Sequence, residues 1–387
     1  MSFETIDFSK EELALYNRHI ILPGFGLESQ KKLKAASVLV VGAGGLGCPA
    51  LLYLTAAGVG TIGIVDFDVV DQSNLQRQVL YGIQDLGKPK VEAAKKRLED
   101  LNPNIRIVTY NKTIGAQNAA EIIGGYDIVV DGSDNFPTRY LVNDACVLLN
   151  KPLVYASIFQ YEGHFTVFNA IDKNGETGPN YRDLYPNPPL PNQVPSCSEA
   201  GVLGVLPGIL GNLQALEVIK IITGLGQIIS GQLFIFNALN FETNIFNVKR
   251  RKDNPLNGGN ITIKSLDDYE QFCGMKENKE NPVKEITAKE LYNWQKSEEK
   301  FQLIDVREIH EYKIVNLGPE LIPLGTLKEN ISKINPHVKL VVLCKTGERS
   351  LKAIRELEEN FGFKNLYCLK GGILAYIDQI KPELTKY

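Results

Sequence analysis

The stretch ASVLVVGAGGLGCP, residues 36–49, decides the fold of the first part of the chain. Its apolar run at 37–41 is typical of a buried strand in a parallel sheet, and the residues after the glycine-rich turn favour a helix. In such a strand–turn–helix unit the glycines allow a tight turn and let a phosphate approach the backbone amides at the helix N-terminus. The stretch therefore predicts a Rossmann-like α/β fold with a nucleotide site at this turn.

Continuous apolar strands alternate with amphipathic helices in the residues that follow. Because these strands are apolar along their whole length, we expect a mostly parallel sheet that helices cover on both faces. The rhythm breaks at 174–196, a segment rich in Pro, Gly and Asn that predicts a long loop rather than an element. The predicted strands are 61–68, 126–135, 152–158 and 164–168, and the predicted helices are 48–58, 91–101 and 211–224, the last ended by Gly224.

A second α/β pattern begins at Thr287, where TAKE fits a capping box at a helix start. A chain of 387 residues is too long for one average core, so two domains are expected. We place the first domain at 1–250, a connecting segment at 251–283 and the second domain at 284–387, with 261–266 as a candidate for local strand pairing. The second domain has predicted strands at 301–305, 339–344 and 365–369 and a predicted helix at 350–362.

The composition argues against several classes of protein. A formal net charge of −3, with no face dominated by Lys and Arg, disfavours a nucleic-acid or membrane surface. The first residues lack the basic-then-apolar pattern of a signal sequence, and we expect no run long enough to span a membrane. The six cysteines show neither a CxxC pair nor the spacing of a disulfide framework, which indicates reduced thiols in a cytoplasmic protein.

Charged residues after the glycine-rich turn bear on which nucleotide binds. Asp66 closes the next predicted strand, where a carboxylate binds ribose hydroxyls, so a nicotinamide-dependent dehydrogenase remains an alternative at this point. Arg77, Lys90 and Asp134 favour a triphosphate with magnesium, because the two cations hold phosphate oxygens and the carboxylate binds the hard cation. For Arg77 or Lys90 taken singly, the alternative is a solvated surface residue.

Several motifs in order resemble the MoeB/ThiF family of adenylyltransferases, which are relatives of the ubiquitin-activating enzymes. The resemblance covers about residues 10–250, and it is strongest to the eukaryotic molybdopterin-synthase sulfurtransferases, which carry the same extra C-terminal domain. It implies ATP-dependent adenylation of the C-terminal glycine of a small ubiquitin-like sulfur carrier protein. The motifs are YNRHIILPGFG (16–26), VGAGGLGCPA (41–50), DFDVVDQSNLQRQ (66–78), GKPK (87–90) and SDNFPTRYLVNDACV (133–147).

The resemblance also implies roles for single residues. Asp134 matches the family's magnesium ligand, and Arg18 matches an arginine that reaches across a homodimer into the partner's active site. Together with Arg77 and Lys90 they would supply the charge neutralisation and alignment that adenylation of a carboxylate needs. The implied ATP-binding positions are Gly45, Asp66, Ser73, Asn74, Arg77, Lys90, Asp134 and Asn135.

Most members of this family bind a structural zinc ion through two CxxC pairs, and this chain has none of those cysteines. The matching positions hold Asn180, Asp183, Asn254 and Asn257. Amide and carboxylate oxygens are poor replacements for thiolates on zinc. We therefore expect no structural zinc, and we expect packing or a partner subunit to hold the segment at 174–196.

Two cysteines are predicted to handle sulfur or acyl groups. Cys344 lies between a strand and a helix in CKTGERS (344–350), where inward-pointing amides, the helix dipole and nearby cations stabilise a thiolate and a persulfide. This loop and its flanks resemble a rhodanese over about residues 285–387. Cys197 matches a family cysteine that attacks the acyl-adenylate or forms a disulfide with the carrier, and the alternative is a small buried thiol.

Other polar residues are interpreted as structural. Asp305 and Arg307 are expected to form a buried ion pair that fixes the fold around the Cys344 loop. The remaining cysteines lie inside elements or away from such loops, and we interpret them as unreactive. They are Cys48, Cys146, Cys273 and Cys368.

The sequence thus predicts adenylation of a MoaD-like carrier of molybdopterin synthesis, then sulfur transfer from a Cys344 persulfide to give a thiocarboxylate. The sulfur donor would be a cysteine desulfurase or thiosulfate, and the enzyme would be a homodimer that needs ATP and Mg²⁺. Three alternatives stay open: a ThiS-like carrier of thiamine synthesis, a scaffold that binds carrier and nucleotide without turnover, and the dehydrogenase. The scaffold is disfavoured because every charged ATP-site position is present.

Overall fold

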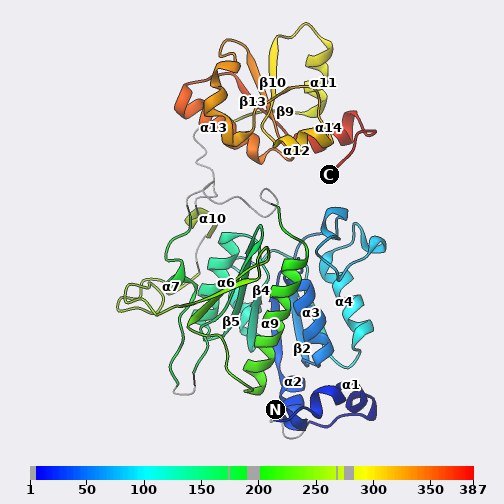
Figure 1. Cartoon of the computed structure of the whole chain (residues 1–387), viewed down its shortest axis with the longest axis vertical. Coiled ribbons are helices and arrows are strands. Elements are labelled where there is room, and N and C mark those ends of the chain that lie inside the picture. Colours follow the sequence, from blue (N-terminus) through cyan, green and yellow to red (C-terminus); the bar gives the residue numbers. More distant parts are fainter. Residues whose placement is uncertain (1–5, 173–174, 190–200, 267–268, 274–282) are drawn as a thin grey trace. The chain divides into compact units, whose positions relative to one another are not determined.

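A computed structural model describes residues 6–172, 175–189, 201–266, 269–273 and 283–387 of the chain (Figure 1). The chain divides into two compact units, residues 1–276 and residues 277–387, and each is described by itself. The first unit contains the glycine-rich turn, and the second contains Cys344.

The first unit is built on an eight-stranded sheet with the strand order β3-β2-β1-β4-β5-β6-β7-β8. Neighbouring strands from β3 to β5 pair in parallel, and the pairs from β5 to β8 are antiparallel. The predicted mostly parallel Rossmann-like sheet is therefore confirmed. The strands are β1 (Ser37–Val41), β2 (Thr61–Val65), β3 (Arg106–Tyr110), β4 (Ile128–Asp131), β5 (Leu153–Phe159), β6 (Glu162–Phe168), β7 (Gln232–Asn237) and β8 (Glu242–Asn247).

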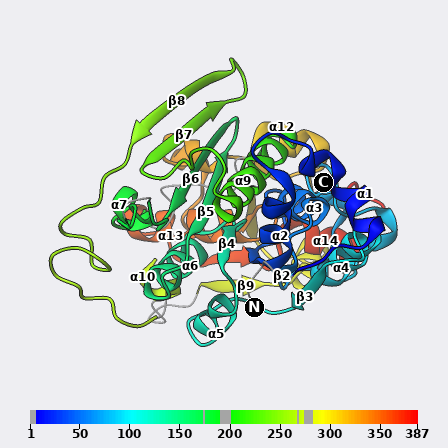
Figure 2. The same cartoon turned by 90° about the horizontal axis from the view of Figure 1, so that it is seen from below.

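Helices cover both faces of the parallel strands, as the apolar strands predict (Figure 2). Side chains alternate between the faces, so Val38 and Val40 of β1 pack with α3, α4 and α9, whereas Leu39 and Val41 pack with α5 and α6. The helices are α1 (Lys10–Ile20), α2 (Gly26–Ala35), α3 (Gly47–Ala57), α4 (Lys90–Leu101), α5 (Ala119–Gly124), α6 (Phe136–Leu148), α7 (Tyr181–Leu184), α9 (Val205–Thr223) and α10 (Tyr269–Phe272).

Helix α9 corrects the expectation that no run is long enough to span a membrane. By length and composition alone, Val205–Thr223 could cross a bilayer. In the structure it is a core helix that packs against α3, β5 and β6, and Leu206, Leu210 and Val218 are fully buried in the main core. Its apolar character therefore reflects burial within the protein.

The structure also corrects two local predictions. The segment 174–196, predicted as a loop without elements, contains the one-turn helix α7 within its described residues 175–189. Asn180 and Asp183 form a capping box that starts this turn, a pattern hidden among the prolines. Residues 261–266 form no strand, so the local pairing considered for them is wrong.

The second unit holds a five-stranded parallel sheet with the order β11-β10-β12-β13-β9. Thr287 and Glu290 form the predicted capping box of its first helix. The strands are β9 (Lys284–Ile286), β10 (Phe301–Asp305), β11 (Glu320–Leu321), β12 (Lys339–Leu343) and β13 (Leu366–Leu369), and the helices are α11 (Ala288–Lys296), α12 (Ile309–Ile314), α13 (Glu348–Phe361) and α14 (Gly372–Ile380).

The buried ion pair predicted between Asp305 and Arg307 is confirmed in this unit. Both side chains are fully buried, and the guanidinium donates to both carboxylate oxygens. It also donates to the carbonyl oxygen of Val315, so the charge is paired and hydrogen-bonded, as burial requires.

Three of the positions where family members carry zinc-binding cysteines form a buried hydrogen-bonded cluster instead, which we call the polar clasp: Asn180, Asp183 and Asn254. The Asn254 amide donates to Asn180 Oδ1 at 3.2 Å and to Asp183 Oδ1 at 2.7 Å. Asp183 also accepts the backbone N–H groups of Asn180 and Arg251. The polar clasp joins the α7 turn to the chain near Asn254.

We predict that Asp183→Ala lowers the free energy of unfolding of the first unit by about 2 kcal/mol, because it leaves several buried donors without an acceptor. Urea denaturation followed by fluorescence measures this. Asp253→Ala is the matched control, since its exposed ion pair with Arg251 contributes little. Treatment with a zinc chelator should leave the unfolding curve unchanged, and a chelator-induced loss of stability would contradict the metal-free clasp.

Candidate active sites

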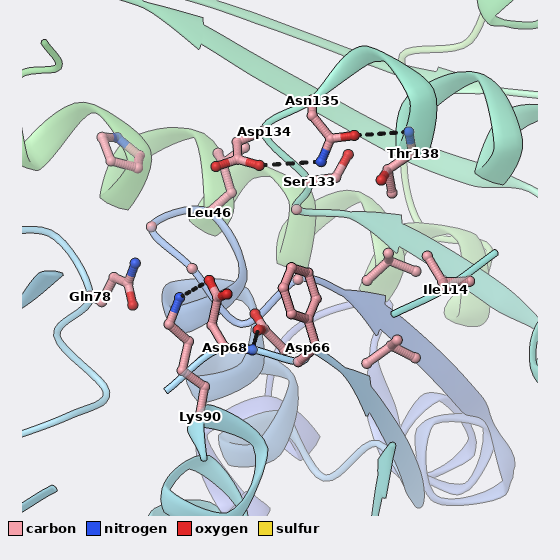
Figure 3. A pocket seen from close by; sticks show the side chains of 18 of the residues that line it. Leu46, Asp66, Asp68, Gln78, Lys90, Ile114, Ser133, Asp134, Asn135 and Thr138 are labelled. Atoms are coloured by element: carbon pink, nitrogen blue, oxygen red, sulfur yellow. Dashed lines mark hydrogen bonds and ion pairs between the residues drawn. The ribbon is translucent and has the colours of Figure 1, made fainter. Parts of the chain in front are cut away.

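An open cavity of about 340 Å³ lies at the carboxyl ends of β1, β2 and β4, a size within the range of small-molecule sites (Figure 3). In open α/β sheets this edge is where ligands bind. The cavity is lined by Val41, Gly42, Gly44, Gly45, Leu46, Val65, Asp66, Phe67, Asp68, Arg77, Gln78, Lys90, Lys112, Thr113, Ile114, Gly132, Ser133, Asp134, Asn135, Thr138, Arg139, Ile158, Val202 and Pro207.

The glycine-rich turn brings backbone close to backbone at the floor of the cavity. A Cβ on Gly47 would lie 1.9 Å from the carbonyl oxygen of Gly42, and a Cβ on Gly42 would lie 2.8 Å from that of Gly132. Gly42 also has φ +93°, which side chains rarely adopt. These glycines allow α3 to begin directly after β1, with its N-terminus at the cavity, where a phosphate is favoured.

Asp66 is held in place beside the turn. Its Oδ2 accepts the backbone N–H of Ala43 at 2.8 Å, and its Oδ1 accepts that of Asp68 at 2.8 Å. Each carboxylate oxygen has a second lone pair for a further donor. The residue therefore fits the predicted contact with ribose hydroxyls.

Lys90 reaches the cavity from the first turn of α4. The residue is only 5% exposed, and its Nζ lies 2.8 Å from Asp68 Oδ2 (Figure 3). Burial removes the alternative that Lys90 is a solvated surface residue. Asp68 was not identified as a site residue from the sequence. The signal was its position two residues after Asp66 in the same strand-end motif.

Arg77 lies on the opposite side of the glycine turn, where its side chain packs near the position of a Gly45 Cβ. Ser73 and Asn74 do not appear among the lining residues; they shape the turn that carries Arg77. The guanidinium donates to the Ser73 carbonyl at 3.1 Å, and the Arg77 N–H donates to the Asn74 carbonyl at 3.0 Å. Ser73 and Asn74 therefore support Arg77, and their contact with the nucleotide stays a prediction.

Carboxylates gather at the end of β4. Asp134 and Asn135 both line the cavity, and Asn135 caps α6 by accepting the Thr138 N–H at 3.0 Å. Asp131 lies just below them, fully buried, and burial raises the pKa of its carboxyl group. Asp134 is thus the exposed carboxylate of the pair, and its oxygens suit Mg²⁺.

Arg139 is a cavity residue that the sequence reasoning missed. It lies one turn into α6, where its Nη2 donates to the Ser133 carbonyl at 3.3 Å. Its guanidinium lies over the rings of Phe136 and Tyr155. The signal was available, because Arg139 follows Asn135 by one helical turn in the SDNFPTR motif.

Two predicted residues are not among the described residues that line this cavity. Arg18 is on α1 and does not line it, so its predicted role in a partner subunit's site stays a prediction. Cys197 lies outside the residues that the structure describes.

The Cys344 loop of the second unit follows β12 and leads into α13. Cys344 is 1% exposed, and its sulfur accepts the backbone N–H of Gly347 at 3.1 Å. Gly347 has φ +114°, which turns this amide inward at the helix start. One of the predicted inward-pointing amides, that of Gly347, contacts the sulfur in this structure, and the sulfur is buried.

Cys368 lies inside an element, β13, as the sequence predicts. Its thiol also lies near the reactive loop, 3.6 Å from the carbonyl oxygen of Gly347, a contact that the sequence did not reveal. Burial raises the pKa of the Cys368 thiol to about 12, so it stays protonated. It therefore packs behind the loop as a neutral group. Cys48, Cys146 and Cys273 are also buried free thiols.

An ion pair supports the Cys344 loop from outside. Both terminal nitrogens of Arg349 donate to the two carboxylate oxygens of Glu311, at 2.5 and 2.7 Å. Burial opposes the charge of Glu311, but the hydrogen bonds from Arg349 and from the Glu308 backbone outweigh it and lower its pKa to about 2. A bidentate, largely buried pair of this kind is one of the stronger electrostatic contacts in proteins.

Comparisons with known proteins match each unit to a family model. The ThiF family model matches residues 16–257, and the rhodanese-like domain model matches residues 287–379. The chain is 44% identical to the probable adenylyltransferase/sulfurtransferase MoeZ of Mycobacterium tuberculosis over 98% of this chain and 96% of that protein. It is 41% identical to adenylyltransferase and sulfurtransferase MOCS3 of Aedes aegypti, over 98% of this chain and 90% of that protein.

A shorter relative matches the first unit. The sulfur carrier protein adenylyltransferase of Thermus thermophilus is 52% identical over 70% of this chain and 99% of its own length. Among solved structures, MccB of E. coli has a TM-score of 0.55 at 23% identity and covers 66% of this chain and 76% of that one. At this identity the structural likeness shows the fold alone.

The lowered pKa of Glu311 predicts a pH dependence of stability. The Glu311–Arg349 pair contributes fully above the ordinary glutamate pKa of 4.5, and its contribution is lost as the pH falls towards about 2. We expect Glu311→Gln to cost about 2 kcal/mol at pH 7, with the difference from wild type shrinking below pH 4.5. Urea unfolding of the two proteins between pH 3 and 7 measures it. Glu358→Gln, on the exposed side of α13, is the control, and a pH-independent difference would contradict the assignment.

Proposed function

Because this chain belongs to the ThiF family and carries a rhodanese-like domain after its ThiF-matched residues, we propose that it adenylates a sulfur carrier protein and then supplies it with sulfur. The substrate of the first reaction is the C-terminal glycine carboxylate of a ubiquitin-like carrier, and the product of the second is a thiocarboxylate. The relatives named adenylyltransferase and sulfurtransferase support this pairing of activities.

The observation that carries the adenylation step is the set of opposite charges around one cavity. Lys90 and Arg77 both line the cavity, and so does Asp134, which follows the end of β4. A carboxylate attacks the α-phosphorus of ATP and expels pyrophosphate, so the reaction needs alignment and neutralisation of phosphate charge more than an acid or base. The two cations supply that neutralisation from the protein.

Further residues complete this site in the proposal. The amides at the α3 N-terminus receive a phosphate, and Asp66 orients the ribose. Asp134, with Asn135 beside it, is the group suited to hold Mg²⁺, which would neutralise the triphosphate when bound. Arg18 of a partner subunit enters the same site, so the active enzyme is a homodimer.

The second step takes place at Cys344. Its thiolate attacks the sulfane sulfur of a donor, either thiosulfate, which leaves as sulfite, or the persulfide of a cysteine desulfurase, which leaves as a thiolate. The resulting persulfide attacks the acyl carbon of the carrier adenylate, and AMP leaves with the electron pair of the broken bond. A thiol then cleaves the acyl disulfide at the Cys344 sulfur and releases the thiocarboxylate. Cys197 is a candidate for that thiol or for an earlier acyl acceptor.

The carrier defines the pathway. We infer a MoaD-like carrier of molybdopterin synthesis, in line with the full-length likeness to MOCS3, and a ThiS-like carrier of thiamine synthesis is the second candidate. The free thiols found among the described cysteines suit a reducing, cytoplasmic setting. A dehydrogenase has no use for the two cations of the cavity, and a scaffold without turnover would have no need to keep every charged position of the ATP site.

We predict that Lys90→Ala lowers the rate of carrier-dependent ATP–pyrophosphate exchange by about 100-fold, because a buried charge at the phosphates is lost. Lys88→Ala is the matched control, since this neighbour forms a surface ion pair with Asp85 and does not line the cavity. Exchange that survives in the Lys90 variant at the wild-type rate would contradict the site.

The carrier and the sulfur step are tested together by mass spectrometry. The full chain is incubated with ATP, Mg²⁺, a thiol, thiosulfate and either a MoaD-like or a ThiS-like carrier, and each carrier is weighed. We expect a gain of about 16 Da on the MoaD-like carrier, as one oxygen is replaced by one sulfur, and no gain with Cys344→Ala. No thiocarboxylate on either carrier would defeat the proposal, and its persistence in the Cys344 variant would defeat the rhodanese half.

A further inference from the structure

Tyr387 lies between the two buried ion pairs that flank the Cys344 loop. Its hydroxyl accepts an N–H of Arg307 at 2.6 Å and donates to Glu311 Oε1 at 3.0 Å. Burial raises the pKa of this phenol to about 12, so the hydroxyl keeps the proton that it donates. The tyrosine therefore connects the Asp305–Arg307 pair to the Glu311–Arg349 pair through one oxygen atom.

The ring of Tyr387 makes a second contact with the reactive loop. The Nζ of Lys345, the residue next to Cys344, lies over this ring at 4.7 Å from its centroid. The Arg307 guanidinium lies 5.6 Å from the same centroid. An ammonium group over an aromatic face is held by the ring's quadrupole. The Tyr387 side chain thus contacts Lys345 directly and is connected to Arg349 through Glu311.

The two ion pairs differ in how firmly they are held. Arg307 is fully buried and already bonded to both oxygens of Asp305 and to the Val315 carbonyl, so it needs no help from Tyr387. Glu311 lies in the first turn of α12, where it accepts the Glu308 N–H and pairs with Arg349. The Tyr387 hydroxyl therefore links the firmly held Asp305–Arg307 pair to the Glu311–Arg349 pair and restricts the movement of Glu311.

Several charged and titratable groups lie near Cys344, and their positions affect the stability of its thiolate. Arg349 and Cys368 interact electrostatically with the Cys344 sulfur, and the Arg349 charge is the favourable one for a thiolate. Lys345 and Glu348 are on the loop itself, and Glu311, Arg307 and Tyr387 lie behind Arg349. Among these groups, the position of Arg349 depends directly on Glu311, and Glu311 on Tyr387.

We propose that Tyr387 is a positioning residue for sulfur transfer at Cys344, holding Arg349 through Glu311 and Lys345 through its ring. The proposal rests on the proposed sulfurtransferase function and names a residue that neither the loop sequence nor the rhodanese resemblance brings forward. Tyr387 acts without touching the sulfur. It fixes the cations that favour the thiolate and the persulfide.

The test compares Tyr387→Phe with Tyr376→Phe in the full chain. The first variant keeps the ring over Lys345 but removes the bridge from Arg307 to Glu311. The second removes a buried hydroxyl of the same unit, bonded to Gln295 Oε1 at 2.6 Å and unconnected to the loop. Two readouts are taken: thiosulfate-to-cyanide sulfur transfer, and the pH dependence of Cys344 alkylation by iodoacetamide, followed by peptide mass spectrometry.

We expect Tyr387→Phe to lower sulfur transfer about fivefold and to move the alkylation profile to higher pH, the size of effect that one hydrogen bond gives. Tyr376→Phe should change thermal stability alone. Glu311→Gln combined with Tyr387→Phe should be no worse than Glu311→Gln by itself, because the tyrosine acts through that carboxylate. An unchanged alkylation profile in Tyr387→Phe, or effects of the two substitutions that multiply, would overturn the proposal.

The two proposals fail in different ways. A wild-type chain that transfers no sulfane sulfur at all would contradict the proposed function. The alkylation profile needs no sulfur donor, so it decides the role of Tyr387 even then.

Discussion

Close backbone contact between strand ends is the constraint on which the first unit depends. Gly42, Gly47 and Gly132 meet where β1, β4 and the start of α3 converge, at distances that leave no room for a Cβ. Because the strands end together there, Asp66, Lys90 and Asp134, far apart in the sequence, line one cavity. The chemistry assigned to that cavity follows from this convergence more than from any single side chain.

The two units solve one problem with similar local geometry. In the proposed mechanism each unit holds negative charge next to the start of a helix: phosphate at α3 in the first and a sulfur anion at α13 in the second. In both, a glycine in the left-handed region turns the backbone between strand and helix, Gly42 in one and Gly347 in the other. Backbone amides and the helix dipole then stabilise the negative charge, so fewer cationic side chains are needed.

Three buried charges among the described residues have a charged partner. Arg307 has Asp305, Arg182 has Asp144, and Glu311 has Arg349, each with short hydrogen bonds. The polar clasp adds a network without a cation. There, amide and carboxylate side chains bond directly to one another and link two segments that are far apart in the sequence.

The sequence by itself determined the α/β class, the glycine-rich turn, most strands of both sheets, the buried Asp305–Arg307 pair and the Cys344 loop, because these depend on local periodicity and short spacings. It did not reveal the α7 turn, whose cap is masked by prolines, or the burial that turns an apolar α9 into a core helix. Only the tertiary structure brought Asp68 onto Lys90, the Cys368 thiol behind the Cys344 loop, and Tyr387 between two ion pairs. These are contacts between residues distant in sequence, and no local pattern encodes them, because chain folding alone decides which side chains share a face.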